Sequence, residues 1–339
     1  MMLPLSSVYP FAPDLPICRI LNGLWQVSGG HGRIDPAAAI PEMLHYHDAG
    51  FTTWDLADHY GPAEEFIGAF RRQLAARSGP QALDQVQAFT KWVPTPGPMT
   101  RQVVERAIDV SRRRMDTDTV DLLQFHWWDY RDPRYLEALE HLAALRAGGK
   151  LRYLGLTNFD TERLAIMVQR GLPIVSNQVQ YSLLDRRPEV AMVPFCQEQG
   201  IVLFTYGTLL GGLLSARYLG RPEPAQRELN TSSLRKYKQM IDAWGGWALF
   251  QELLQAVNLV AERHGVSIAN VAVRALLDQP AVAGVIVGAR LGVAEHMVEN
   301  GRVFTFQLDA EDWERLAAVQ ARSRDLFKLI GDCGDEYRR

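Results

Sequence analysis

The sequence predicts an α/β fold in which strands and helices alternate along most of the chain. From Ile20 onward, short apolar runs alternate with longer amphipathic segments, a rhythm typical of a parallel barrel or a doubly wound sheet. A doubly wound sheet usually carries a Gly-x-Gly-x-x-Gly motif after its first strand, and the Gly-Gly-His-Gly at 29–32 lacks that spacing, which indicates an ordinary loop. The expected strands number eight, as a closed barrel requires: 20–26, 51–55, 86–90, 120–125, 151–155, 173–178, 201–205 and 283–287.

Amphipathic segments between these runs predict helices, and several of them begin with capping signals. Asp35 precedes Pro36, and Asp160 precedes Thr161 and Glu162, so each aspartate is placed to accept the first free backbone N–H groups of a helix. The expected helices are 36–49, 63–77, 100–115, 134–147, 160–169, 188–199, 249–264 and 268–278.

We expect residues 1–339 to form a single barrel domain with three additions. Residues 1–19 are rich in proline and predict an N-terminal arm or a plug at the bottom of the barrel, and 309–339 predict a C-terminal helix and tail. The long segment 207–248 interrupts the rhythm after the seventh strand. Such loops are uncommon unless functional, and loops that follow barrel strands lie at the catalytic face. We therefore expect a lid over a bound ligand, with a plain surface insertion as the alternative.

Composition restricts the class of function. The chain has 339 residues and a net charge of −3 from 36 basic and 39 acidic residues, which does not favour a nucleic-acid surface. The cysteines Cys18, Cys196 and Cys333 are widely spaced and lack metal-ligand spacing, so we expect reduced thiols and no metal site. No signal peptide is apparent, and the longest uncharged apolar-rich run, 201–216, is too short to span a membrane. These features predict a cytoplasmic protein.

Polar residues follow three successive expected strands. Asp55 ends the apolar run at 51–55 and Tyr60 comes five residues later, while Lys91 and His126 follow the next two strands. The carboxyl ends of parallel strands meet at one end of a barrel, so these side chains should lie together. A buried aspartate needs a cationic partner, and Lys91 can supply it.

These pieces resemble the aldo-keto reductases, NAD(P)H-dependent oxidoreductases built on a (β/α)8 barrel, also called a TIM barrel. The family's catalytic tetrad is Asp, Tyr, Lys and His in this chain order. The resemblance rests on Trp-Asp-Leu-Ala-Asp-His-Tyr-Gly at 54–61, Thr-Lys-Trp at 90–92 and Leu-Leu-Gln-Phe-His-Trp at 122–127, and it extends to Asp309 and beyond. It implies that Asp55, Tyr60, Lys91 and His126 are catalytic.

The chemistry of these four groups fits carbonyl reduction. A free tyrosine has a pKa of ~10, and a nearby ammonium lowers it by stabilising the phenolate. We expect Lys91 to do this for Tyr60, Asp55 to keep Lys91 charged, and His126 to donate a hydrogen bond that aligns the substrate oxygen. A nicotinamide cofactor must supply the hydride. The alternative is purely structural: an ion pair, a rim tyrosine and a core histidine.

The resemblance also implies residues that bind the nicotinamide end of the cofactor. Gly-Leu-Thr-Asn-Phe at 155–159 is similar to the family's Gly-x-Ser-Asn-Phe, with Thr157 in place of serine. Asn158 and Gln178 match the positions that hold the nicotinamide carboxamide, since a planar carboxamide needs a donor and an acceptor. Tyr206 matches the aromatic residue that stacks on the nicotinamide ring.

Further matches concern the phosphates of the cofactor. Gly207, Leu209 and Gly211 are expected to contact the pyrophosphate through their backbone, although relatives usually carry serine at the position of Gly207. The remaining matches are Arg217 in the same loop, Gly288 and Arg290 after the eighth strand, and His296, Glu299 and Asn300 in the following helix. Arg290 suits the adenosine 2′-phosphate, while His296 stands where relatives carry Arg or Gln. We therefore expect NADP(H), with NAD(H) as the alternative.

Aromatic residues crowd the expected mouth of the barrel. Trp25, Trp92 and Trp127 match positions that line the substrate pocket of relatives, which suits an aldehyde, a ketone or a stacked sugar ring. The sequence thus predicts an enzyme that reduces a small carbonyl compound, or oxidises the corresponding alcohol or sugar, with Tyr60 as general acid and base. Two alternatives are a cofactor-binding regulatory subunit that resembles potassium-channel β subunits and a lyase that uses Lys91 as a Schiff base.

Overall fold

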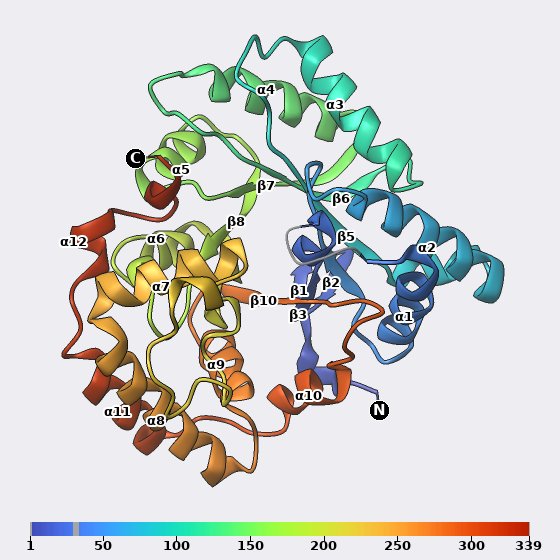
Figure 1. The fold of residues 1–339 in the computed structure, drawn as a ribbon. Coiled ribbons are helices and arrows are strands. Elements are labelled where there is room, and N and C mark those ends of the chain that lie inside the picture. Colours follow the sequence, from blue (N-terminus) through green and yellow to red (C-terminus); the bar gives the residue numbers. More distant parts are fainter. Residues whose placement is uncertain (1, 30–33, 339) are drawn as a thin grey trace.

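A computed structural model describes residues 2–29 and 34–338, and the expected loop residues Gly30, His31 and Gly32 lie outside this part. Eight parallel strands close into a barrel in the order β10-β3-β4-β5-β6-β7-β8-β9 (Figure 1). The strands are β3 (Ile20–Gly23), β4 (Thr53–Asp55), β5 (Gln87–Trp92), β6 (Val120–Phe125), β7 (Leu151–Thr157), β8 (Ile174–Gln180), β9 (Val202–Tyr206) and β10 (Val282–Gly288).

The predicted barrel and its eight strands are confirmed, with differences at the strand ends. The strand expected at 20–26 ends at Gly23, where a β-carbon would come 2.8 Å from Cγ2 of Ile286 on the neighbouring strand. The chain then turns through a short 3-10 helix, Trp25–Ser28.

Helices follow the strands and surround the barrel. Asp35 and Asp160 cap their helices as expected, accepting hydrogen bonds from the backbone N–H groups of Ala37 and Arg163. The helices are α1 (Pro36–Asp48), α2 (Ala63–Ser78), α3 (Arg101–Arg114), α4 (Arg134–Ala147), α5 (Thr161–Gln169), α6 (Met192–Gln199), α7 (Ser232–Trp244), α8 (Gly246–His264), α9 (Ile268–Leu277), α10 (Met297–Gly301), α11 (Ala310–Gln320) and α12 (Leu326–Ile330).

Helix α7 lies inside the segment 207–248, which we expected to be a loop. Its buried residues Tyr237, Ile241 and Trp244 recur at helical spacing, and the Thr231 hydroxyl accepts a hydrogen bond from the backbone N–H of Leu234. The helix packs on the loop that follows β9. The long insertion therefore covers the loop at the carboxyl end of β9 with regular structure.

The N-terminal segment forms an antiparallel hairpin of β1 (Val8–Ala12) and β2 (Leu15–Cys18). Leu15 and Ile17 pack against Leu21, Phe89 and other inward-facing residues of the barrel strands. Phe11 adds ring contacts with Phe89 and Phe204 at 5.9 and 5.5 Å. The hairpin thus covers one end of the barrel with apolar side chains, where the sequence offered an arm or a plug as alternatives.

Most of the apolar core lies between the strands and the helices, where side chains that point outward from the barrel meet the inner faces of the helices. In the described ranges, no helix combines the length and the apolar character needed to cross a membrane. Cys18, Cys196 and Cys333 are all buried and free of disulfides.

Candidate active site

A buried ion pair stands at the carboxyl ends of β4 and β5. The Lys91 ammonium donates to Oδ2 of Asp55 at 2.6 Å and to the Leu56 carbonyl at 2.9 Å, and both charged side chains are only 4% exposed. Burial lowers the pKa of Lys91, and the charge of Asp55 opposes that effect. The pair provides the partner that a buried aspartate requires, so the two residues are brought together as expected.

Two glutamines complete the surroundings of Asp55. Its second oxygen, Oδ1, accepts hydrogen bonds from Nε2 of Gln124 at 3.1 Å and Nε2 of Gln178 at 2.7 Å. The Gln178 amide also donates to the Gln124 side chain at 2.8 Å. Gln124 was not expected here, although it lies two residues before His126 and strand alternation turns both to the same face. Gln178 therefore donates its amide hydrogen bonds within this network, whereas we expected it to bind a nicotinamide carboxamide.

Tyr60 lies in the loop after β4, with the Lys91 ammonium 5.0 Å from the centre of its ring. Trp25 packs edge-on against it at 4.9 Å. Desolvation, followed by the negative charge of Asp55, raises the pKa of Tyr60 well above that of a free tyrosine. This direction is opposite to the expected one. The phenol is therefore protonated at neutral pH and can act as an acid.

His126 follows β6 and is buried. Its Nδ1 lies 3.1 Å from the Thr157 carbonyl, and because a carbonyl only accepts, we assign the proton of the neutral ring to Nδ1. Burial lowers the pKa of His126 to about 4, so the ring is neutral near pH 7. Nε2 is buried, and no group of the described residues bonds to it. In this tautomer Nε2 accepts a hydrogen bond, which corrects the expectation that it donates one.

The tryptophans predicted to line the substrate pocket do not all lie at the mouth of the barrel. Trp25 stands beside Tyr60, whereas Trp92 and Trp127 are buried in the layer between strands and helices, packed against Phe125 at 5.5 and 6.0 Å. Trp128 instead lies 4.3 Å from the His126 ring and is 43% exposed. Because successive side chains after β6 point in opposite directions, Trp128 and not Trp127 faces the mouth of the barrel.

The ends of β7 and β9 bring Asn158 and Tyr206 together. Tyr206 donates from its hydroxyl to Oδ1 of Asn158 at 2.7 Å. Asn158 has a left-handed backbone conformation, with φ of 60°, which turns the chain out of the strand. Thr157 hydrogen-bonds through its hydroxyl to the Gln178 carbonyl at 3.3 Å, so its side chain ties β7 to β8.

The loop after β9 holds the residues expected to contact a pyrophosphate. Gly207 and Gly211 have positive φ values of 74° and 65°, and Leu209 lies between them. Tyr237 of α7 packs so closely that a β-carbon at Gly207 would come 2.4 Å from its hydroxyl oxygen. Arg217 is exposed and stacks 5.6 Å from the Tyr218 ring. Side chains of α7 therefore cover this glycine loop.

The end of β10 leads to an exposed arginine. Gly288 packs against the Gln26 side chain, and Arg290 pairs through its backbone with Ala294 while its side chain is exposed. No ion pair of Arg290 occurs among residues 2–29 and 34–338. His296 is exposed just before α10, which carries Glu299 and Asn300. An exposed guanidinium without an ion pair among the described residues is a donor that fits a phosphate.

A family model described as the aldo/keto reductase family matches residues 19–321. This chain belongs to the aldo-keto reductase family. Aldo-keto reductase YhdN of Bacillus subtilis (strain 168) is 29% identical over 285 residues, which cover 80% of this chain and 81% of that protein. Among solved structures, the glycerol dehydrogenase AKR11B4 from Gluconobacter oxydans has 25% identity and a TM-score of 0.76, covering 94% of this chain and 96% of that one.

A further relative shows that this domain occurs inside longer proteins. Flagellar radial spoke protein 5 of Chlamydomonas reinhardtii is 28% identical over 257 residues, or 66% of this chain, but the match spans only 49% of that protein. YhdN is named as a reductase and AKR11B4 as a dehydrogenase, in keeping with an enzyme of this family. Members of the family generally use nicotinamide cofactors.

The C-terminal tail of this aldo-keto reductase lies beside α5 (Figure 1), where Asp332 accepts a hydrogen bond from the backbone N–H of Thr161 at 2.8 Å. Arg187 is almost fully buried, pairs with Asp185 at 2.8 Å and donates to Glu336 of the tail at 3.0 Å. This clamp places Tyr337, whose ring lies 6.4 Å from that of His126 and whose hydroxyl is 3.1 Å from that of Tyr206. The sequence offered no signal for this contact between distant segments.

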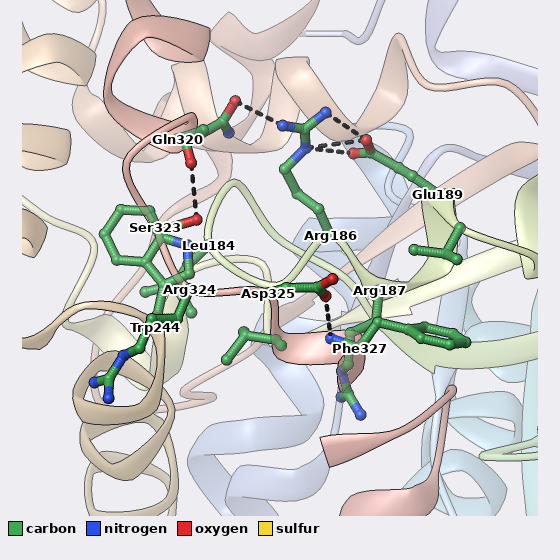
Figure 2. A pocket seen from close by; sticks show the side chains of 12 residues that line it. Leu184, Arg186, Arg187, Glu189, Trp244, Gln320, Ser323, Arg324, Asp325 and Phe327 are labelled. Atoms are coloured by element: carbon green, nitrogen blue, oxygen red, sulfur yellow. Dashed lines mark hydrogen bonds and ion pairs between the residues drawn. The ribbon is translucent and has the colours of Figure 1, made fainter. Parts of the chain in front are cut away.

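A cavity of about 320 Å³ opens on the flank of the barrel, between the segment after β8 and the region around α12 (Figure 2). Its charged groups are already paired: Arg186 binds Glu189 at 2.5 Å and donates to Gln320 at 3.3 Å. Arg187 lines the cavity and also holds the tail. We therefore assign the cavity no ligand and treat the cavity as part of the packing around the tail.

Proposed function

We propose that this reductase catalyses hydride transfer between NADP(H) and a small aldehyde or ketone, or the reverse oxidation of an alcohol or sugar. The observation that supports this proposal most strongly is the arrangement at the open end of the barrel. A protonated Tyr60, the buried Asp55–Lys91 pair and the unpartnered Nε2 of His126 are brought to one mouth.

When bound, the nicotinamide cofactor supplies the hydride that adds to the carbonyl carbon. Tyr60 gives its proton to the carbonyl oxygen, and the raised pKa keeps that proton on the phenol until the oxygen becomes basic. The Lys91 ammonium then offsets the phenolate charge, while Asp55 holds Lys91 in place. Nε2 of His126 accepts a hydrogen bond from the hydroxyl that forms and thereby orients the alcohol.

The residues around the mouth fit a nicotinamide dinucleotide. Asn158 offers an amide next to the aromatic ring of Tyr206, and the exposed Arg290 can pair with a 2′-phosphate through two parallel hydrogen bonds. We infer that Asn158 and Tyr206 hold the nicotinamide end and that Arg290 confers a preference for NADP(H). The three unpaired cysteines also support a cytoplasmic enzyme.

The role of Tyr60 is tested by Tyr60→Phe, which removes the hydroxyl and keeps the ring against Trp25. We expect turnover of an aldehyde with NADPH to fall by about 10²–10⁴-fold, the usual contribution of a positioned proton donor. The affinity for NADPH, measured by calorimetry, should barely change. Turnover within a factor of three of wild type would exclude Tyr60 as the acid.

The cofactor preference is tested by Arg290→Ala. We expect the KM for NADPH to rise by about 10–100-fold, the equivalent of about 1.5–3 kcal/mol for a hydrogen bond to a charged group. The KM for NADH should stay the same, because NADH lacks the 2′-phosphate. Arg72→Ala, at an arginine of α2 that is 60% exposed and that we assign no role in cofactor binding, serves as the matched comparison. An equal rise for both cofactors would show that Arg290 supports the loop instead.

A further inference from the structure

A lysine ammonium lies in a cage of three tyrosines at the mouth of the barrel. The Nζ atom of Lys236, on α7, is 5.3 Å from the ring centre of Tyr206, 5.5 Å from that of Tyr237 and 4.3 Å from that of Tyr337. It also donates to the Tyr337 hydroxyl at 2.5 Å. Across the part of the chain that the structure describes, Lys236 forms no ion pair with a carboxylate.

The three rings come from three separate segments, each fixed by its own contacts. Tyr206 ends β9 and is bonded to Asn158. Tyr237 is buried against the glycine loop that follows β9. Tyr337 is carried in by the tail through the buried Glu336–Arg187 pair. The cage therefore exists only because the insertion and the tail close over the same strand end.

An ammonium over an aromatic face is attracted by the negative charge of the π-system. A planar nicotinamide ring stacks on such a face, and in its oxidised form it is a cation as well. Lys236 and a nicotinamide ring are therefore both attracted to the π-system of Tyr206. Among the described residues Lys236 forms no direct ion pair, although its charge, after that of Arg187, helps to lower the pKa of the Glu336 carboxyl. The long and flexible side chain of Lys236 can therefore leave the cage at modest cost.

We propose that the Lys236 ammonium occupies the face of Tyr206 that the nicotinamide ring takes, so that cofactor binding must displace it. This inference rests on the proposed function, in which Tyr206 stacks on the nicotinamide. Lys236 then lowers cofactor affinity at the nicotinamide end only. The adenine end and the 2′-phosphate, at Arg290, are bound independently of Lys236.

The test is calorimetric titration of the apo protein with whole cofactors and with fragments that lack nicotinamide. Lys236→Met keeps the chain length and removes the charge, and Lys328→Met, at a lysine that is 82% exposed on α12, is the matched control. We expect Lys236→Met to bind NADPH and NADH about 3–10-fold more tightly, the size of one cation–π contact. Binding of ADP-ribose and of 2′-phospho-ADP-ribose should not change.

A second variant, Tyr337→Phe, removes the hydroxyl that holds Lys236 and should shift the cofactor affinity in the same direction by a smaller factor. Weaker binding of cofactors and fragments alike by Lys236→Met would overturn the proposal and place Lys236 on the phosphates. Unchanged cofactor binding would also overturn it. If the wild-type protein and all variants bind no nicotinamide dinucleotide, the proposed function fails, and this inference fails with it.

Discussion

Two lysine–tyrosine pairs stand at the mouth of the barrel, and they differ in how the lysine is held. Lys91, near Tyr60, is buried and bonded to a carboxylate. Lys236, near Tyr337, is partly exposed and, within the part of the chain that the structure describes, contacts aromatic rings and a hydroxyl without a direct ion pair. The first pair joins β5 to the loop that follows the neighbouring strand β4, whereas the second joins an insertion to the C-terminal tail.

The charge of Lys91 must remain paired in the folded protein, whereas the charge of Lys236 can be displaced by a ligand. Removing one member of a buried ion pair leaves the other charge desolvated and unpaired, which is strongly unfavourable. Releasing Lys236 returns an ammonium to water and leaves behind uncharged tyrosines and Glu336, whose carboxylate keeps its ion pair with Arg187. The strand ends thus suit a fixed catalytic group, and the insertion and tail suit a contact that exchanges with a ligand.

The largest expected effect comes from Lys91→Met. We expect the free energy of unfolding to fall by about 3–5 kcal/mol, because Asp55 becomes a buried charge without a cation. Carbonyl reduction at neutral pH should be abolished, since the phenolate of Tyr60 loses its counter-charge. Urea unfolding and a turnover assay measure the two effects.

The double variant Asp55→Asn with Lys91→Met is the control, because it removes both charges. It should regain part of the lost stability without regaining activity. A stability loss below about 1 kcal/mol in the single variant, the range of an exposed pair, would remove the contrast between the two lysines.

A smaller effect on the free energy of unfolding is expected from the titration of His126, at the same mouth of the barrel. Its pKa is lowered to about 4 in the folded protein, compared with about 6.5 in an unfolded chain. As the pH falls below 6.5 the unfolded state takes up the proton first, so stability is lost until the pH passes the folded pKa. We expect this residue to account for roughly 2.5 kcal/mol between pH 7 and pH 4.5.

The measurement is urea unfolding of the wild type and His126→Gln at both pH values. The variant lacks the imidazole, so its stability should fall less over this interval than that of the wild type. Equal losses would mean that His126 is not held neutral by burial.

The smallest effect is expected from Lys236→Met. Removing an ammonium that faces rings at the edge of the site should change the free energy of unfolding by no more than about 1 kcal/mol. The same urea titration used for Lys91→Met gives the comparison directly. A loss as large as that of Lys91→Met would show that Lys236 is a structural residue and not an exchangeable one.

Most of the candidate catalytic residues could be predicted from the sequence because they lie at the ends of adjacent strands. Asp55, Lys91 and His126 each follow a recognisable apolar run, and parallel strands bring such ends together. Gln124 could have been found from its alternation with His126. The direction of the Tyr60 pKa shift could not, because it depends on how much water the surrounding side chains remove from the phenol.

The sequence by itself therefore determined the eight-stranded barrel, the family and the residues at the strand ends, since these follow from local periodicity and chain order. Only the tertiary structure decided which tryptophan faces the mouth, that α7 covers the glycine loop, and that Lys236 and Tyr337 meet. The physical reason is that these contacts join segments far apart in the chain, whose approach depends on the packing of the whole barrel and leaves no local pattern.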